Sequence, residues 1–279
     1  MKGYRVILSI ENDFQLKGGF MSCSCGPKER YELEIIDIVK HDEVTYSYDF
    51  KGDLDSWHEG DASKLILDVD GKEEARRFSY VTLDDEDMIR FTTRIKASPS
   101  SYKSRLNEHK IGDVLRISSP KEGLRLRREN RPVALISNGV GIAAIRAYIK
   151  KYEKEASGIP EMLQINVDRH GKIFYEEMND FEKKLPFRSI YLSDRKTFYS
   201  TLDFEMQALM EKHQVEPYIY VIGSDAFVIE TRSHLKTLGF SNEDILIEKH
   251  VLSSESCGCG PDNGCGCGAN IIKTIGGIN

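Results

Sequence analysis

The stretch that decides the fold is Arg131-Pro-Val-Ala-Leu-Ile-Ser-Asn-Gly-Val-Gly-Ile-Ala-Ala-Ile-Arg-Ala-Tyr-Ile149. Its apolar run at 133–136 predicts a buried strand, and the apolar residues that follow at intervals of three and four predict a helix. Between them, Gly139 and Gly141 form a turn where the helix N-terminus offers backbone N–H groups to an anion. A Cβ there would obstruct both the turn and an approaching phosphate. An ordinary strand–helix turn has similar spacing, so the rest of the chain must decide.

The strand–helix rhythm continues after this stretch. Further apolar runs lie at 162–167, 188–192, 218–222 and 245–247, with helical patterns at 174–185 and 227–238. This alternation predicts a doubly wound parallel sheet, whose ligands bind beyond the carboxyl ends of the strands. These ends are expected at residues 137–138, 168–169, 193–194 and 223–225.

The first half of the chain has a different pattern. Short β-rich segments lie at 31–39, 44–50, 64–69, 75–81, 88–94 and 114–118, with one helical pattern at 101–107. Asp70-Gly71 is a hairpin signal, and closely spaced short strands predict a small antiparallel barrel. We therefore expect an N-terminal segment over 1–30, a barrel over 31–130, an α/β domain over 131–252 and a tail over 253–279.

Composition limits the function classes. The chain has 279 residues, 40% hydrophobic and 30% charged, which indicates a soluble globular protein of two domains. A net charge of −6 argues against general nucleic-acid binding. No apolar run approaches the ~20 residues of a membrane span, and the N-terminus lacks the pattern of a secretory signal. We expect a cytoplasmic protein without a membrane span.

Several segments then follow one another in an informative order. They are Arg76-Arg-Phe-Ser79, Ser101-Tyr-Lys-Ser-Arg-Leu106, Asn138-Gly-Val-Gly-Ile-Ala-Ala144, Tyr220-Val-Ile-Gly-Ser-Asp225 and Ile247-Glu-Lys-His250. This order resembles the ferredoxin–NADP⁺ reductase superfamily of flavoproteins over about residues 31–250. The resemblance implies a flavin-binding barrel followed by an NAD(P)-binding domain, with hydride passing from nicotinamide C4 to flavin N5 in the cleft between them.

The resemblance also implies roles for residues of the barrel half. Arg76 would hold a flavin phosphate, a task suited to a guanidinium fork. Phe78 stands where the family has a tyrosine packed on the flavin ring, and Ser79 would place a hydroxyl near flavin N5, as the candidate catalytic residue. Ser100 and Ser101 could contact the flavin phosphate through a helix N-terminus, although an N-cap explains them equally well.

Residues of the second half would bind the nicotinamide nucleotide. Gly139, Gly141 and Gly223 belong to the family-like turns around its pyrophosphate. Asp168 at the end of the next strand would favour NADH, whereas Arg169 could accept the 2′-phosphate of NADPH. Both can equally be solvated loop charges. The choice between NADH and NADPH, like that between FAD and FMN, stays open.

The implied function is a flavin-dependent NAD(P)H oxidoreductase that passes electrons through FAD to a protein, iron–sulfur or metal acceptor. Three departures from the family pattern support an alternative. Ala143-Ala144 stand where Thr-Pro is frequent, Ile222 replaces a cysteine near the nicotinamide, and His250 replaces a near-terminal aromatic residue. The alternative is a non-catalytic flavin- or metal-binding sensor or scaffold on the same fold.

All six cysteines occur in Cys-x-Cys pairs. They are Cys23, Cys25, Cys257, Cys259, Cys265 and Cys267. The last four could bind zinc or a [2Fe–2S] cluster, or act as redox-active thiols. Their Cys-x-Cys-x5-Cys-x-Cys spacing differs from the usual zinc and plant-type ferredoxin patterns.

Overall fold

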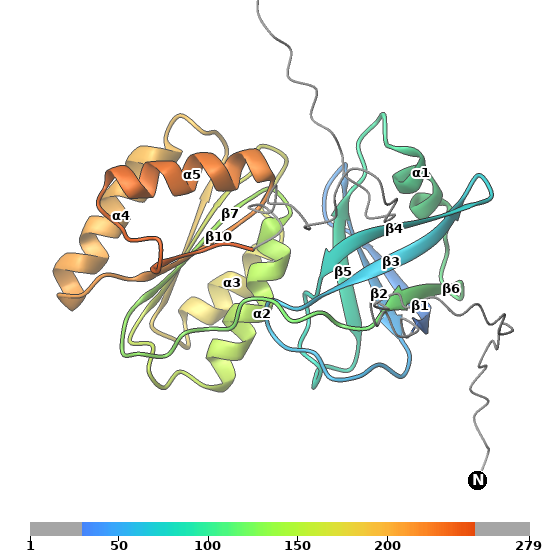
Figure 1. Cartoon of the computed structure of the whole chain (residues 1–279), viewed down its shortest axis with the longest axis horizontal. Helices are drawn as coiled ribbons and strands as arrows, with labels where there is room; N and C mark the ends of the chain where they lie inside the picture. The colour runs from blue at the N-terminus through green and yellow to red at the C-terminus, as the bar shows by residue number, and fades with distance from the viewer. Residues whose placement is uncertain (1–29, 249–279) are drawn as a thin grey trace, which may run out of the picture.

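The computed structural model describes residues 30–248. They form an antiparallel sheet with one helix, followed by a parallel sheet with four helices (Figure 1). This confirms the predicted fold class. The predicted N-terminal segment, the cysteine tail and His250 lie outside the described residues.

The first domain is a six-stranded antiparallel sheet in the order β4-β3-β6-β1-β2-β5. Its strands are β1 Arg30–Lys40, β2 Thr45–Lys51, β3 Ala62–Val69, β4 Lys72–Ser79, β5 Ile89–Arg94 and β6 Val114–Ser118. The β3–β4 turn is Asp70-Gly71, with φ of 53° and 74°, as a two-residue hairpin requires. The strand predicted at 75–81 therefore begins earlier, directly after Gly71.

One short helix, α1 Ser101–Glu108, packs on β3 of this sheet. Its buried residues are Tyr102 and Leu106, and the Tyr102 hydroxyl donates to the Leu65 carbonyl at 2.8 Å. The Ser100 hydroxyl caps the helix by accepting a hydrogen bond from the Lys103 backbone N–H. Residues i and i+4 of a helix lie on the same face, so Tyr102 and Leu106 together set which side of α1 faces the sheet.

The second domain is a five-stranded parallel sheet in the order β11-β10-β7-β8-β9. Its strands are β7 Val133–Asn138, β8 Met162–Val167, β9 Phe187–Leu192, β10 Tyr218–Ile222 and β11 Ile245–Leu246. Every residue of β8 is buried, which is typical of a parallel strand covered on both faces.

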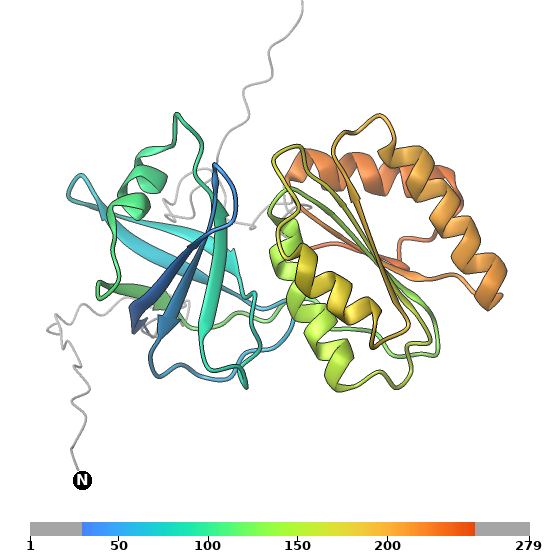
Figure 2. The same cartoon turned by 180° about the vertical axis from the view of Figure 1, so that it is seen from behind.

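Four helices cover this sheet, two on each face (Figures 1 and 2). They are α2 Gly141–Lys154, α3 Tyr175–Glu182, α4 Phe198–His213 and α5 Asp225–Thr237. One hydrophobic cluster joins α4 and α5 to the sheet, and a second cluster joins α2 and α3 to the opposite face. The domain is therefore doubly wound, as predicted, and the carboxyl ends of its strands lie at one edge.

Arg146 of α2 fastens the two domains together. It is 7% exposed and donates to the Val81 carbonyl at 2.9 Å and to Glu86 at 2.9 Å, both in the first domain. It also donates to Glu177 of α3 at 2.8 Å. Burial alone would lower the pKa of Arg146, but the hydrogen bonds to Glu86 and Glu177 outweigh it and raise that pKa. The guanidinium is therefore a permanent buried charge between the domains.

Candidate functional site

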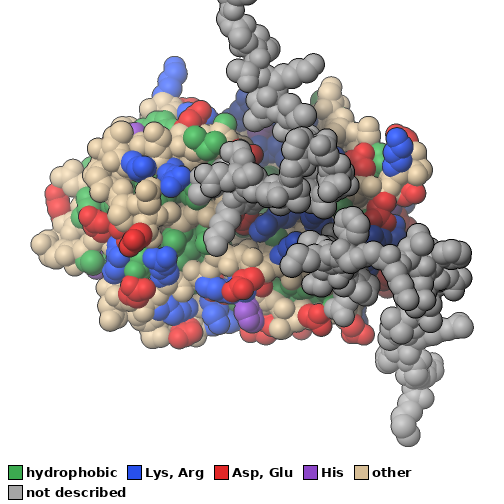
Figure 3. All heavy atoms as spheres, viewed as in Figure 1, with side chains coloured by type: hydrophobic (Ala, Val, Ile, Leu, Met, Phe, Trp, Pro, Cys, Tyr) green, Lys and Arg blue, Asp and Glu red, His purple; other side chains and the backbone are tan. Residues whose placement is uncertain are grey.

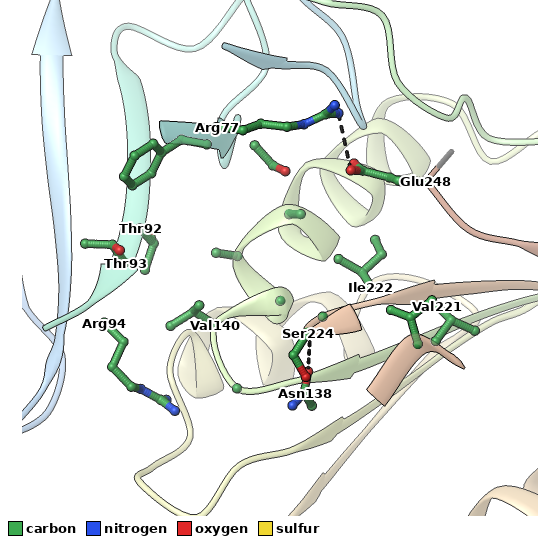
Figure 4. A pocket seen from close by; sticks show the side chains of 18 of the residues that line it. Arg77, Thr92, Thr93, Arg94, Asn138, Val140, Val221, Ile222, Ser224 and Glu248 are labelled. Carbon is green, nitrogen blue, oxygen red and sulfur yellow. Dashed lines mark hydrogen bonds and ion pairs between the residues drawn. The ribbon is translucent and has the colours of Figure 1, made fainter. Parts of the chain in front are cut away.

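A cleft of about 490 Å³ lies where the carboxyl ends of β7 and β10 meet the barrel (Figure 4). Both domains line it. The barrel contributes Arg77, Phe78, Ser79, Thr92, Thr93, Arg94 and Lys103, and the α/β domain contributes Asn138, Gly139, Val140, Gly141, Ala143, Ala144, Val221, Ile222, Gly223, Ser224 and Val228, with Glu248 beyond β11. Six of the residues predicted for the site or singled out as departures thus share one cavity with Phe78 and Ser79.

The barrel wall is built from β4, β5 and the first turn of α1. Phe78 is 7% exposed, and its ring packs on Phe91 with centroids 5.8 Å apart. The ammonium of Lys103 lies 4.6 Å from the centroid of the Phe78 ring and contacts the Thr93 hydroxyl. The wall therefore combines an aromatic face, hydroxyl groups and positive charge.

The two arginines of the Arg76-Arg-Phe-Ser79 segment have different surroundings. Arg77 lines the cleft and pairs with Glu248 at 3.3 Å (Figure 4). Arg76, the predicted phosphate ligand, lies over the Tyr102 ring on α1, 5.3 Å from its centroid, and pairs with Glu74 at 2.8 Å. Its side chain is 54% exposed. Arg76 is therefore beside α1, outside the residues that line the cleft.

The predicted serines divide in the same way. Ser79 lines the cleft. Ser100 caps α1, which is the second of the two roles expected for it. Ser101 borders a separate hollow together with Asp68 and Asp70. Three carboxylates, Asp68, Asp70 and Glu108, border that hollow against the single cation Arg105, a net negative charge that disfavours a phosphate.

The glycine turn between β7 and α2 forms the opposite wall. Gly139 has a φ of +56°, a left-handed conformation that favours glycine, and its N–H donates to the Val167 carbonyl at 3.0 Å. A Cβ on Gly141 would lie 2.7 Å from the Ile222 carbonyl oxygen. This second glycine is required because α2 begins directly against the end of β10.

The end of β10 is joined to the end of β7 by a side chain. The Asn138 Oδ1 accepts a hydrogen bond from the Ser224 N–H at 3.0 Å (Figure 4). A Cβ on Gly223 would lie 2.0 Å from this oxygen. The predicted glycines 141 and 223 are thus explained first by the close approach of two strand ends, which also leaves the backbone open toward the cleft.

Asp168 and Arg169 are adjacent in sequence, but Asp168 is bound to an arginine of the barrel whereas Arg169 borders a separate hollow. Asp168, with a side chain 2% exposed, forms an ion pair of 2.5 Å with Arg94 of β5 and accepts from the His170 N–H at 3.0 Å. Arg94 reaches across the domain boundary to within 3.3 Å of the position of a Cβ on Gly139. Asp168 is therefore already engaged by a cation of the barrel.

A smaller hollow of about 220 Å³ lies beyond the ends of β8 and β9. Its basic residues are Arg169, His170 and Lys172, and Tyr191 forms part of its wall. The Lys172 ammonium lies 4.8 Å from the centroid of the Tyr175 ring. Asp168 also borders this hollow, but its carboxylate is paired with Arg94.

Sequence reasoning did not single out Arg77, Arg94 or Lys103. Burial and, to a smaller extent, the positive charge of Arg76 lower the pKa of Lys103 to about 8. The Nε of Arg94 is buried and has no hydrogen-bond partner within residues 30–248. Arg94 ends a strand at the cleft, a position that could have marked it, whereas nothing in the sequence separates Lys103 from an ordinary surface lysine.

No metal site can be assigned within the described part of the chain. Residues 30–248 contain no cluster of three or more His, Cys, Asp or Glu side chains arranged to hold an ion. The predicted ligands Cys257, Cys259, Cys265 and Cys267 lie outside these residues. None of the described helices is long and apolar enough to cross a bilayer.

Comparison with known proteins places the fold in context. No family model matches the chain. It is 33% identical over 86 residues to a flavohemoprotein of Pseudomonas putida, covering 31% of this chain and 22% of that protein. It is 21% identical over 193 residues to the toluate 1,2-dioxygenase electron transfer component of Pseudomonas putida, covering 67% and 57%. The chain thus spans less than two thirds of each relative's length.

Solved structures show the same two-domain arrangement. Ferredoxin-NADP⁺ reductase from Plasmodium falciparum with 2′P-AMP has a TM-score of 0.66 at 14% identity, over 78% of this chain and 95% of that one. The FAD/NAD binding domain of nitric oxide dioxygenase from Vibrio cholerae has a TM-score of 0.65 at 16% identity, over 78% and 97%. The chain therefore has the two-domain fold of these ferredoxin-NADP⁺ reductase and FAD/NAD binding domain structures.

Proposed function

We propose that the chain is a flavin-dependent NAD(P)H oxidoreductase that passes electrons from a nicotinamide nucleotide through a flavin to an acceptor. The observation that supports this best is the composition of the cleft. One wall is a barrel surface with an aromatic ring, hydroxyls and cations, and the other is a glycine turn at the carboxyl edge of a parallel sheet. Two different nucleotides therefore have complementary walls in one cavity.

The barrel wall fits the chemistry of a flavin nucleotide. A flavin has a flat apolar ring with a polar edge and an anionic phosphate chain. Phe78 offers a ring face, Ser79 and Thr93 offer hydroxyls, and Lys103 with Arg77 offers positive charge. When bound, a flavin supplies acceptance of a hydride and release of electrons singly or in pairs. The chain's residues hold and orient it, with Ser79 as the proposed hydroxyl donor to its polar edge.

The opposite wall fits the pyrophosphate of a nicotinamide nucleotide. Gly139 and Gly141 expose backbone at the start of α2, where the N–H groups of a helix favour an anion. Arg94 lies against this turn, and its Nε has no hydrogen-bond partner among residues 30–248. Its other end is held by Asp168, so its guanidinium is oriented before the nucleotide arrives. We assign Arg94 the role of an additional anion ligand.

We further propose that NADPH is preferred over NADH. Arg169, His170 and Lys172 border the small hollow beyond β8, on the side where the adenosine would lie. Asp168, the acid that would favour a free ribose, is bound to Arg94. A cation-rich hollow suits a 2′-phosphate. Arg169→Glu should then raise the Kd for NADPH by about tenfold, close to the 1.4 kcal/mol of one charge-assisted contact, and leave the Kd for NADH unchanged.

We also propose that the cysteine tail carries the group that accepts electrons from the flavin. Four thiolates in Cys257–Cys267 could bind a [2Fe–2S] cluster or zinc that relays electrons to a protein acceptor. Anaerobic purification followed by iron and zinc analysis tests this directly. Metal that disappears when Cys257 and Cys265 are replaced by serine supports the proposal, and metal-free protein contradicts it.

The central experiment is anaerobic addition of NADPH and NADH to protein loaded with flavin. We expect bound-flavin bands near about 370 and 450 nm that bleach on addition of nucleotide. Flavin that binds but does not bleach would support the alternative sensor or scaffold, for which Ala143, Ala144 and Ile222 are the basis. Protein that binds no flavin contradicts the oxidoreductase and the flavin-binding form of the alternative, and leaves only its metal-binding form.

A further inference from the structure

Lys103 occupies an unusual place for a lysine. It belongs to the first turn of α1, yet its side chain reaches the cleft, where it lies next to residues of β4 and β5. Its ammonium lies 4.6 Å from the centroid of the Phe78 ring and contacts the Thr93 hydroxyl. Three elements thus hold this charge against the ring that forms the proposed flavin wall. An ammonium over an aromatic face is stabilised by the ring quadrupole without being neutralised.

The charged groups around Lys103 are paired with one another. Arg77 of β4 and Arg94 of β5 line the same cleft as Lys103, and the charge of Arg76 contributes to lowering the pKa of Lys103. The nearby carboxylates are already in ion pairs: Glu74 with Arg76, Glu248 with Arg77 and Asp168 with Arg94. The acids near α1, which are Asp68, Asp70 and Glu108, border the separate hollow beside Ser101 and Arg105. Within residues 30–248, Lys103 has no carboxylate partner.

Such a position favours an anionic ligand. Within the described cleft, Glu248 is the one acidic residue of the lining, against the three cations Arg77, Arg94 and Lys103. Lys and Arg side chains are also visible along the boundary between the two domains (Figure 3), although the whole chain is acidic. A phosphate placed here would supply the counter-charge that Lys103 lacks within residues 30–248.

We propose that the Lys103 ammonium pairs with the anionic part of the bound flavin nucleotide, so that flavin is held tightly when Lys103 is charged and released when it is neutral. This inference rests on the proposed function, because it assumes that the cleft holds a flavin. Lys103 would then be a binding residue that makes flavin affinity depend on pH.

The direction in which flavin affinity changes with pH follows from the pKa of Lys103 without and with a bound anion. Burial and, to a smaller extent, the charge of Arg76 lower the pKa of Lys103 to about 8. Burial raises the pKa of Tyr102, the phenol nearest to Arg76, far above this value. An anion bound to the ammonium raises the pKa of Lys103. Flavin affinity is therefore full below about pH 8 and falls as pH rises above it, by up to about tenfold per pH unit.

The test is a titration of flavin-free protein with FAD, and separately with FMN, followed by quenching of flavin fluorescence between pH 6.5 and 9.5. We expect the wild-type Kd to rise at least fivefold across this range. Lys103→Arg keeps a permanent charge and should bind with a nearly constant Kd. Lys103→Met keeps an apolar stem and should bind weakly at every pH. Lys110→Met, at an exposed lysine after α1, is the matched control and should behave as wild type.

A second readout follows Lys103 itself. The ¹³Cε resonance of the lysine that disappears in Lys103→Met should titrate near pH 8 without flavin and at higher pH with it. A wild-type Kd that is constant with pH, or a Lys103→Met variant with the wild-type pH profile, overturns the inference and leaves the proposed function standing. Absence of flavin binding at every pH overturns both. Thermal unfolding of each variant shows whether weak binding reflects loss of folding.

Discussion

The two walls of the cleft are built in different ways. The barrel wall presents long side chains, above all Arg77, Arg94 and Lys103. The α/β wall presents backbone and small residues, because Gly141 and Gly223 leave no room for a Cβ between the ends of β7 and β10. A side-chain wall can be altered one charge at a time. A backbone wall depends on the packing of whole elements, so changes there should affect folding and binding together.

The two walls form one cleft only if the domains keep their relative position. Because Arg146 joins the domains, we expect its substitution to have the largest effect. Arg146→Ala would leave Glu86 and Glu177 without their shared partner at the domain boundary. We expect a loss of about 3–5 kcal/mol in the free energy of unfolding, because one partner of a buried ion cluster is removed. Urea unfolding followed by circular dichroism measures this loss, and flavin reduction by NADPH should fall with it.

Lys154→Ala is the matched control for that substitution. Lys154 also pairs across the domain boundary, with Asp85, but both side chains are substantially exposed. An exposed pair of this kind contributes about 0–1 kcal/mol. Equal losses for the two variants would show that Arg146 has no special role in joining the walls.

The backbone wall can be disturbed through Gly141. A Cβ on this residue would lie 2.7 Å from the Ile222 carbonyl oxygen, so α2 or β10 would have to shift. We expect Gly141→Ala to lower the free energy of unfolding by about 1–3 kcal/mol, as overpacking does. Nucleotide affinity, measured by difference spectroscopy, should fall in the same variant. Gly71→Asn lies at a hairpin turn where a Cβ meets nothing within 4 Å but φ is +74°, so it should lower the free energy of unfolding by about 1 kcal/mol and leave nucleotide affinity unchanged.

Much of the fold could be predicted because its strands are covered or bounded in simple ways. β6, β8 and β10 occur at the predicted residues, since short apolar runs ended by turn residues have few other conformations. Helix α4 was not among the predicted helical patterns. Its apolar periodicity is obscured because Phe204 is 68% exposed and Glu205 is buried, and it ends at Gln214 with a φ of +56° instead of at a glycine.

The site was less predictable because its contacts join distant parts of the chain. Arg76 and Arg77 are adjacent in sequence, and only the pairing of β4 with β3 decides which one reaches the cleft. Lys103 looks like a solvated helix residue until its side chain is placed against Phe78 of β4 and Thr93 of β5. Arg94 and Asp168 are 74 residues apart, and no local pattern links them. Residue types identified the two walls, whereas tertiary contacts determine which side chains line them.

Arg94 is a side chain of the barrel wall that lies against the glycine turn of the α/β wall. Its substitution therefore tests how strictly the two walls are separated. Arg94→Met should raise the Kd for NADPH by about tenfold, the equivalent of roughly 1.4 kcal/mol. The same change also leaves the buried Asp168 unpaired, so part of the loss could come from a disturbed loop. Stability measured alongside the Kd shows how large that part is.

The double variant Arg94→Met/Asp168→Asn separates the two causes. Replacing the carboxylate by an amide removes the unpaired charge, so stability should recover while the NADPH Kd stays high, provided that Arg94 contacts the nucleotide directly. If the Kd also returns to the wild-type value, Arg94 acts only by neutralising Asp168. In that case the glycine turn binds the pyrophosphate through its own backbone, and the division between a side-chain wall and a backbone wall is complete.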